Sequence, residues 1–409
     1  MGLPEHGWTT EEIVSALASK RSADARWQEG RTFGLVFDGG PEVREVAEAV
    51  AADFLHDNAL NTAAFPSLGQ IQSEVVAICC DLVHAPPGAA GFMTSGGTES
   101  ILMAVKAARE RGLAERGVTQ PEIVLATSAH AAFHKAAHYF GLTVRSVPVG
   151  PDWRADPAAM AAAATPRTVL VVGSAPQYPQ GVIDPIPALA EIAAQVGASL
   201  HVDACMGGFV LPFMEQLGRA VPPWDFRVEG VTTLSADLHK LGYAPKGASV
   251  LLHRTKELRR YQTFTTDDWL GGRYASPAMQ GTRPGLPMAC AWAVLHRLGL
   301  EGYRRLTAAA LDAAGRIRAG VGEIDGLGVL GQPDAHLLAI AGEGIFGVGE
   351  AMAGRGWFLD RQGPPDALHL TVSAGNAPVV DAFLADLTAA ARARAHGAGG
   401  RASGYATLE

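Results

Sequence analysis

The sequence predicts an α/β fold in which a mostly parallel sheet carries helices on both faces, followed by a smaller α+β lobe. From Gly91 to Arg254, short β-branched runs alternate with Ala-rich helical stretches, an order typical of parallel sheets. Beyond a long predicted helix at 288–320, shorter strands and helices alternate again. The predicted strands of the two regions are IVLATS, VRSVPV, TVLVVG, SLHVDA, VTTLSA and ASVLLH, then GVLG, HLLAIAG and ALHLTVS.

The length predicts several cooperating lobes, because 409 residues far exceed the roughly 150 of one typical domain. Residues 1–57 form a predicted N-terminal arm, made of a helix, a Gly-flanked segment at 31–40 and another helix. We assign 58–287 to a large domain and 288–395 to a small C-terminal domain. Residues 396–409 are rich in Gly, Ala and Ser and predict a flexible tail.

Composition narrows the class of protein. Hydrophobic residues make up 48% of the chain and charged residues 18%, a balance that excludes global disorder. The net charge of −8 disfavours nucleic acid and anionic membranes as partners. The four cysteines show no disulfide or zinc spacing, and no apolar run reaches the roughly 20 residues that span a bilayer. We therefore expect a soluble, cytoplasmic protein.

The segment TSGGTES, residues 94–100, predicts a phosphate cradle. Gly96 and Gly97 follow a strand-like run and precede a long helical stretch, where backbone N–H groups and the Thr98 hydroxyl can bind an anion. The spacing matches neither an ATP-binding loop nor the GxGxxG of nicotinamide cofactors. A plain glycine turn with a helix cap is the alternative for this segment alone.

A carboxylate ends the predicted strand SLHVDA. His201 and Asp203 share one face of that strand, and Asp203 lies at its carboxyl end, where open α/β sheets bind ligands. A helix cap is the alternative role for this acid.

The segment SADLHKLGYAPKG, residues 235–247, places His239 and Lys240 directly after another predicted strand, with Lys246 in the same loop. A lysine held at a sheet edge suits Schiff-base chemistry, although most loop lysines are solvated. Together the three segments offer a phosphate cradle, an acid and, 37 residues after Asp203, a lysine. These are the three anchors of pyridoxal phosphate: its phosphate, its ring nitrogen and its aldehyde.

His130, His134 and His138 are spaced at i, i+4 and i+8, as on one face of a helix. That spacing also suits zinc, but the segment offers no carboxylate to serve as a general base. We expect no metal; either His130 stacks on a cofactor ring or all three are ordinary half-buried imidazoles.

At these residues the chain resembles the group II pyridoxal phosphate decarboxylase superfamily, and within it the sphingosine 1-phosphate lyases, from about Gly34 to Ser373. The similar stretches are FMTSGGTESILMAVKAAR, AHAAFHKAAHYFG, PQYPQGVIDPIP, LHVDACMGGFVLPFME, SADLHKLGYAPKGASVLL and YASPAMQGTRPG. The resemblance implies a fold-type-I homodimer whose active site lies at the subunit interface, with 58–287 as the domain that binds pyridoxal phosphate.

The resemblance also implies the roles of single residues. Lys240 would carry the cofactor, Asp203 would pair with the ring nitrogen, and His130 would stack on the ring. The phosphate would be held by the cradle residues and His239, together with residues of the neighbouring subunit; these residues are Gly96, Gly97, Thr98 and His239, with Gly281 and Thr282 of the neighbour.

The sequence departs from the lyases where their substrate phosphate is held. A tyrosine of the lyases is Phe37 here, a histidine is Asn61, and the FPHG histidine is Gln180. Asn58 and Lys246 are retained. Because each charge-assisted hydrogen bond contributes about 1.5–3 kcal/mol, these losses weaken a phosphate site. We expect a substrate other than the usual phosphosphingoid base.

The leading hypothesis is a carbon-carbon lyase that acts beside a substrate amine, by retro-aldol cleavage of a β-hydroxy amine. An amino-acid decarboxylase is the runner-up, because it uses the same electron sink. An aminotransferase would need a cationic clamp, for which Arg283, Arg355 and Arg361 are the candidates. A noncatalytic scaffold is the hypothesis from another class.

Overall fold

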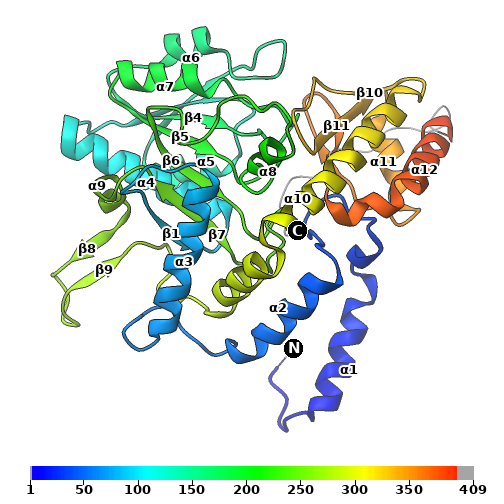
Figure 1. The fold of residues 1–409 in the computed structure, drawn as a ribbon, viewed down its shortest axis with the longest axis horizontal. Coiled ribbons are helices and arrows are strands. Elements are labelled where there is room, and N and C mark those ends of the chain that lie inside the picture. Colours follow the sequence, from blue (N-terminus) through cyan, green and yellow to red (C-terminus); the bar gives the residue numbers. More distant parts are fainter. Residues whose placement is uncertain (1, 394–409) are drawn as a thin grey trace.

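The computed structural model describes residues 2–393; the predicted flexible tail 396–409 lies outside the described residues. Two sheets are connected by one long helix, α10 (Leu286–Gly322), which crosses the molecule between them (Figure 1). This helix contains a break at Gly299, whose φ of 53° is left-handed and suits glycine. The predicted α/β architecture with a smaller C-terminal lobe is confirmed.

The large sheet has seven strands in the order β1-β7-β6-β5-β4-β2-β3. In chain order they are β1 (Ala90–Thr94), β2 (Glu122–Ala126), β3 (Thr143–Val147), β4 (Thr168–Ser174), β5 (Ser199–Asp203), β6 (Val231–Ala236) and β7 (Ser249–His253). Only β7 runs antiparallel to its neighbours in this sheet, β1 and β6. Strands β2, β4 and β5 are buried throughout, which explains why they appear in the sequence as continuous apolar runs.

Successive side chains of the central strands pack into separate cores on the two faces. On β2, Val124 belongs to a core that α7 and α10 help form, whereas Ile123 and Leu125 pack with α4 and α5 on the other face. The helices of this region are α3 (Pro66–Leu82), α4 (Gly97–Arg116), α5 (Ala132–Phe140), α6 (Pro157–Ala163), α7 (Ile186–Gln195), α8 (Leu211–Gln216) and α9 (Lys256–Arg259).

The carboxyl ends of β1, β2, β4, β5 and β6 meet at one edge of the large sheet, because these strands run in the same direction. The predicted cradle follows β1, Asp203 ends β5, and the lysine loop follows β6. Ligands of open α/β sheets bind at this edge. The topology therefore brings the separate sequence motifs together.

The small sheet has the order β10-β11-β13-β12 and is antiparallel. Its elements are β10 (Leu327–Val329), β11 (Leu337–Gly342), α11 (Ile345–Ala353), β12 (Asp360–Gln362), β13 (Ala367–Thr371) and α12 (Val380–Ala393). The sequence does not predict β12 or a hairpin of β8 (Phe264–Thr266) and β9 (Tyr274–Ser276), because their segments DRQ, FTT and YAS form no apolar run. The hairpin projects from the large domain (Figure 1).

The N-terminal arm contains α1 (Thr10–Lys20) and α2 (Pro41–Asp53), as predicted. The segment between them joins the small sheet: Phe33 is fully buried in its core, and the Thr371 N–H donates to the Phe33 carbonyl. Helix α1 buries none of its residues. None of the helices within residues 2–393 combines the length and apolar composition of a bilayer-spanning segment.

Phe33→Ala should destabilise the fold by about 3–5 kcal/mol, because it removes a buried ring that lies 4.8 Å from the ring of Phe383. Leu35→Ala is the matched control, since Leu35 is 58% exposed two residues away and its truncation should change stability by less than about 0.5 kcal/mol. Urea unfolding measures both. Equal losses in the two variants would show that the segment does not dock through Phe33.

Candidate active site

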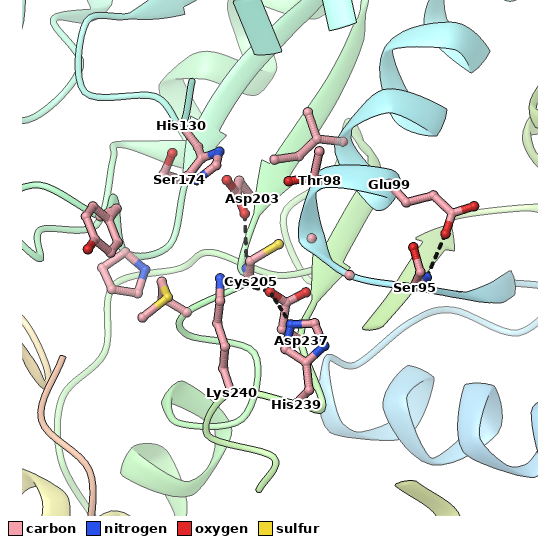
Figure 2. Close-up of a pocket in the computed structure, with 16 residues that line it drawn as sticks. Ser95, Thr98, Glu99, His130, Ser174, Asp203, Cys205, Asp237, His239 and Lys240 are labelled. Atoms are coloured by element: carbon pink, nitrogen blue, oxygen red, sulfur yellow. Dashed lines mark hydrogen bonds and ion pairs between the residues drawn. The ribbon is translucent and has the colours of Figure 1, made fainter. Parts of the chain in front are cut away.

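A cavity of about 390 Å³ lies at the carboxyl edge of the large sheet. It brings together seven of the predicted site residues: Gly96, Gly97, Thr98, His130, Asp203, His239 and Lys240. In Figure 2, Lys240 and His239 rise from the loop after β6, and Asp203 and Cys205 lie at the end of β5. Side chains from five separate segments of the chain thus surround one space.

The glycine cradle leaves room for an anion because it carries no side chains. A Cβ at Gly97 would come within 2.7 Å of the Cys205 sulfur, so glycine is required there. The start of α4, whose first N–H groups have no partner within the helix, forms this wall. Glu99 fixes the loop by accepting hydrogen bonds from the N–H groups of Ser95, at 2.6 Å, and Met279, at 2.8 Å.

Asp203 is held rigidly at the end of β5. It is 7% exposed, and its Oδ1 accepts hydrogen bonds from the Cys205 N–H at 3.1 Å and the Ser235 hydroxyl at 3.4 Å. The same hydroxyl lies 3.2 Å from Nε2 of His201, whose pKa burial lowers to about 4. A carboxylate with a fixed position suits a partner of the cofactor's ring nitrogen.

Lys240 forms an ion pair that sequence analysis missed. Its Nζ lies 2.8 Å from Oδ2 of Asp237, whose side chain is only 1% exposed. Burial alone would lower the pKa of Lys240, but the combined effect of the neighbouring Asp237, Cys205 and Asp203 raises it. The only sequence signal was an acid three residues before the lysine, directly after a strand.

His239 is a neutral imidazole whose tautomer follows from its partners. Its Nδ1 accepts hydrogen bonds from the N–H groups of Gly247, at 3.3 Å, and Ala248, at 3.2 Å, so Nε2 carries the proton. Burial lowers its pKa to about 4 despite the nearby Asp237. His239 can therefore donate a hydrogen bond from Nε2 to an anion held in the cradle.

The three spaced histidines do not share one helical face. His130 precedes α5, lines the cavity and accepts a hydrogen bond at Nδ1 from the Ala132 N–H, whereas His134 and His138 are exposed. Burial lowers the pKa of His130, which favours the neutral ring. Within residues 2–393 no cluster of three or more metal-ligating side chains is present, so the geometry gives the zinc interpretation no support.

The predicted substrate residues are only partly assembled in one chain. Phe37 and Lys246 line a separate cavity of about 330 Å³, where the Lys246 Nζ lies 4.8 Å from the Phe37 ring centre. The Lys246 ammonium also donates to the His239 carbonyl at 2.7 Å. Asn58 and Asn61 line neither of these two cavities; their side chains accept from the N–H groups two residues ahead.

Three further predicted residues lie outside the cavity of their own chain. Gln180 is 5% exposed and accepts a hydrogen bond from the Gln177 amide at 2.9 Å. Gly281 and Thr282 are exposed, in the stretch between β9 and α10.

The cavity fits pyridoxal phosphate on its own geometry. Glycines at the start of α4 form its cradle, Asp203 ends strand β5, and Lys240 lines the same cavity. With the cofactor bound, Gly96, Gly97, Thr98 and His239 would hold the phosphate, Asp203 the ring nitrogen and Lys240 the aldehyde carbon.

Comparisons with known proteins agree with this fit. Residues 25–327 match the family model of the pyridoxal-dependent decarboxylase conserved domain. The chain is 41% identical to sphingosine-1-phosphate lyase of Arabidopsis thaliana, over 92% of this chain and 71% of that protein. It is 31% identical to a probable L-aspartate decarboxylase of Pyrococcus abyssi, over 87% of this chain and 90% of that protein.

Two solved structures extend the comparison. A sphingosine-1-phosphate lyase of Burkholderia pseudomallei superimposes with a TM-score of 0.91 at 40% identity, covering 97% of this chain and 94% of that one. A glutamate decarboxylase of Lactobacillus brevis, with a TM-score of 0.84 at 20% identity over 97% of this chain and 96% of that one, shows the shared fold. From the cavity, the family model and these identities together, we conclude that the chain belongs to the pyridoxal-dependent decarboxylase family.

Proposed function

We propose that this pyridoxal phosphate-dependent lyase performs a retro-aldol cleavage, in which a β-hydroxy amine gives an aldehyde and a smaller amine. One observation carries the proposal. The cradle, Asp203 and Lys240 share a single cavity in a chain that is 40% identical to a sphingosine-1-phosphate lyase over nearly its whole length. The bound cofactor supplies an electron sink for the pair released when a bond to the amine-bearing carbon breaks.

The residues of the cavity have distinct tasks in this reaction. Asp203 keeps the ring nitrogen protonated, which makes the ring a stronger electron acceptor. The neutral His130 packs against the ring, and His239 donates its Nε2 proton to the phosphate. Lys240 would hold the aldehyde carbon of the bound cofactor, and its amine, when free, would exchange protons with the substrate.

The substrate we propose lacks the phosphate of phosphosphingoid bases. Phe37 has no hydroxyl to donate, and the Lys246 ammonium is already engaged by the His239 carbonyl and the Phe37 ring. The Gln180 amide oxygen is bonded to Gln177. Losing two or three donors at about 1.5–3 kcal/mol each would weaken phosphate binding strongly.

We further propose a cytoplasmic homodimer with a shared site. Gly281 and Thr282 are exposed in one chain, where a second subunit could use them to complete the phosphate site. Helix α1 has an uncovered apolar side formed by Ile13, Val14 and Leu17. The four cysteines are all unpaired, which suits a reducing compartment.

An amino-acid decarboxylase is the second candidate, and the match to a probable L-aspartate decarboxylase favours it. It requires the same sink but expels carbon dioxide. For an aminotransferase, the candidate clamp residues Arg283, Arg355 and Arg361 do not line the cavity of their own chain. Arg283 instead donates to the Ala59 carbonyl and the Gln72 side chain.

Product analysis tests the reaction. Protein loaded with pyridoxal phosphate is incubated with long-chain β-hydroxy amines, their phosphates and amino acids. We expect an aldehyde from β-hydroxy amines, lost at least about a thousandfold in Lys240→Ala because that lysine carries the cofactor. Lys256→Ala, at an exposed lysine outside the cavity, is the control and should match wild type. Carbon dioxide or a keto acid as the only product would refute retro-aldol cleavage.

Restoring the missing donors tests the proposed substrate. Phe37→Tyr combined with Asn61→His should improve kcat/KM for phosphorylated β-hydroxy amines by about tenfold or more, because one regained charge-assisted hydrogen bond contributes about 1.5–3 kcal/mol. Turnover of the unphosphorylated amines, measured in parallel, should change little. If the double variant keeps the wild-type ratio of kcat/KM for phosphorylated and unphosphorylated amines, then Phe37 and Asn61 do not determine this specificity.

A further inference from the structure

The buried carboxylate of Asp237 lines the same cavity as the predicted cofactor anchors. Asp237 follows β6, and its side chain is 1% exposed. A Cβ at Gly97 would come within 2.8 Å of its Oδ2, so the carboxylate lies directly behind the anion cradle. An uncompensated negative charge in that place would repel a phosphate and would cost several kcal/mol to bury. Asp237 therefore needs a positive partner.

Lys240 is that partner. Its Nζ lies 2.8 Å from Oδ2 of Asp237, while Nε2 of His239 is farther away, at 3.7 Å. The His239 ring is neutral, because its Nδ1 accepts two backbone hydrogen bonds. The compensating charge must then be the ammonium of Lys240. Burial alone would raise the pKa of Asp237, but the combined effect of its neighbours, with Lys240 the strongest of them, lowers it.

Other titratable groups near Lys240 do not replace this pair. Cys205 and Asp203 face it from the end of β5, His130 from the loop after β2, Lys246 from its own loop, and His336 from the start of β11. Burial keeps the Cys205 thiol protonated by raising its pKa. Asp203 is engaged by Cys205 and Ser235, which leaves Asp237 as the carboxylate in direct contact with the amine.

We propose that Asp237 is a positioning residue that holds the free amine of Lys240 as an ammonium, so that Lys240 acts on the substrate as a proton donor and not as the base. The inference rests on the proposed function, in which Lys240 carries the cofactor and a substrate amine displaces it. The inference also assigns the two proton transfers to different groups. Lys240 gives a proton to the amine-bearing carbon, and a separate base takes the hydroxyl proton of the substrate.

Every proton that moves in this scheme has a donor and an acceptor. The substrate would enter as an ammonium, and its extra proton would pass to Lys240 when the substrate takes the place of the lysine on the cofactor. After the aldehyde leaves, the electron pair left on the amine-bearing carbon forms a new C–H bond with the Lys240 proton. The neutral Lys240 amine then displaces the product, which leaves as an ammonium with the proton that the separate base took from the hydroxyl.

The first test uses cofactor-free protein and needs no turnover. Acetylation of Lys240 by acetic anhydride is followed against pH by peptide mass spectrometry. In wild type, the pH at which Lys240 reaches half of its maximal labelling rate should lie above the ordinary lysine pKa of about 10.4. Asp237→Asn should increase labelling at pH 8 by about a hundredfold, because a charge at this distance shifts a pKa by about 1–3 units. Asp225→Asn, which removes another buried ion-paired carboxylate outside the cavity, should leave it unchanged.

A wild-type midpoint at or below about 10.4, or equal profiles in wild type and Asp237→Asn, would overturn the inference. The pH of half-maximal labelling in wild type tests the inference even if the variant does not fold. Because this labelling requires no cofactor, it can succeed or fail independently of the proposed function, whose failure would appear as wild-type protein that forms no aldehyde.

The second test follows a single turnover of the loaded protein. In wild type, aldehyde and product amine should appear together. At pH 9, Asp237→Asn should release the product amine about tenfold more slowly relative to the aldehyde than wild type does, because a smaller fraction of Lys240 then carries a proton. Asp237→Glu, which keeps the charge, should restore part of the rate. Equal slowing of both products would mean that Asp237 acts only on the structure, and would overturn the inference.

Discussion

Strands β1, β2, β4, β5 and β6 run in the same direction, and their carboxyl ends therefore meet at one edge of the large sheet. Segments that are more than a hundred residues apart in sequence, such as Gly97 and Lys240, become neighbours there. Burial of the central strands on both faces fixes their register, because a shift of one residue would exchange the two cores. The geometry of the cavity thus depends on how the central strands pack into the two cores.

Charge compensation is the second requirement at that edge. Asp203 and Asp237 are both buried carboxylates, but their surroundings give them different partners. Asp203 accepts hydrogen bonds from neutral groups, and we propose that it pairs with the ring nitrogen of the cofactor, whereas Asp237 is paired with Lys240. Two acids that are similarly buried can therefore have different proposed roles: Asp203 would contact the cofactor, and Asp237 would contact Lys240.

The sequence was sufficient for the architecture and for a group of residues that meet in one cavity, because both leave local signals. Buried strands appear as apolar runs, and the glycines, Asp203 and Lys240 follow directly after such runs. The cradle and Lys240 belong to one cavity, as the motifs implied. The short strands β8, β9 and β12 left too few residues for a periodic pattern.

Other features depend on tertiary contacts that no local pattern records. Phe33 resembles an arm residue in sequence but completes the core of the small sheet. His130 was grouped with His134 and His138 by spacing, yet α5 begins after it and separates it from them. Asp237 lies only three residues before Lys240, but acids are common in turns, and the sequence does not show that the two side chains meet.

In the proposed holoenzyme, Lys240 alone carries pyridoxal phosphate in this cavity. Borohydride reduction of the loaded protein makes the bond between lysine and cofactor permanent, and peptide mass mapping then locates it. We predict one pyridoxyl group per chain, on Lys240. A pyridoxyl group on Lys246 or any other lysine, or protein that remains unlabelled, would contradict this account.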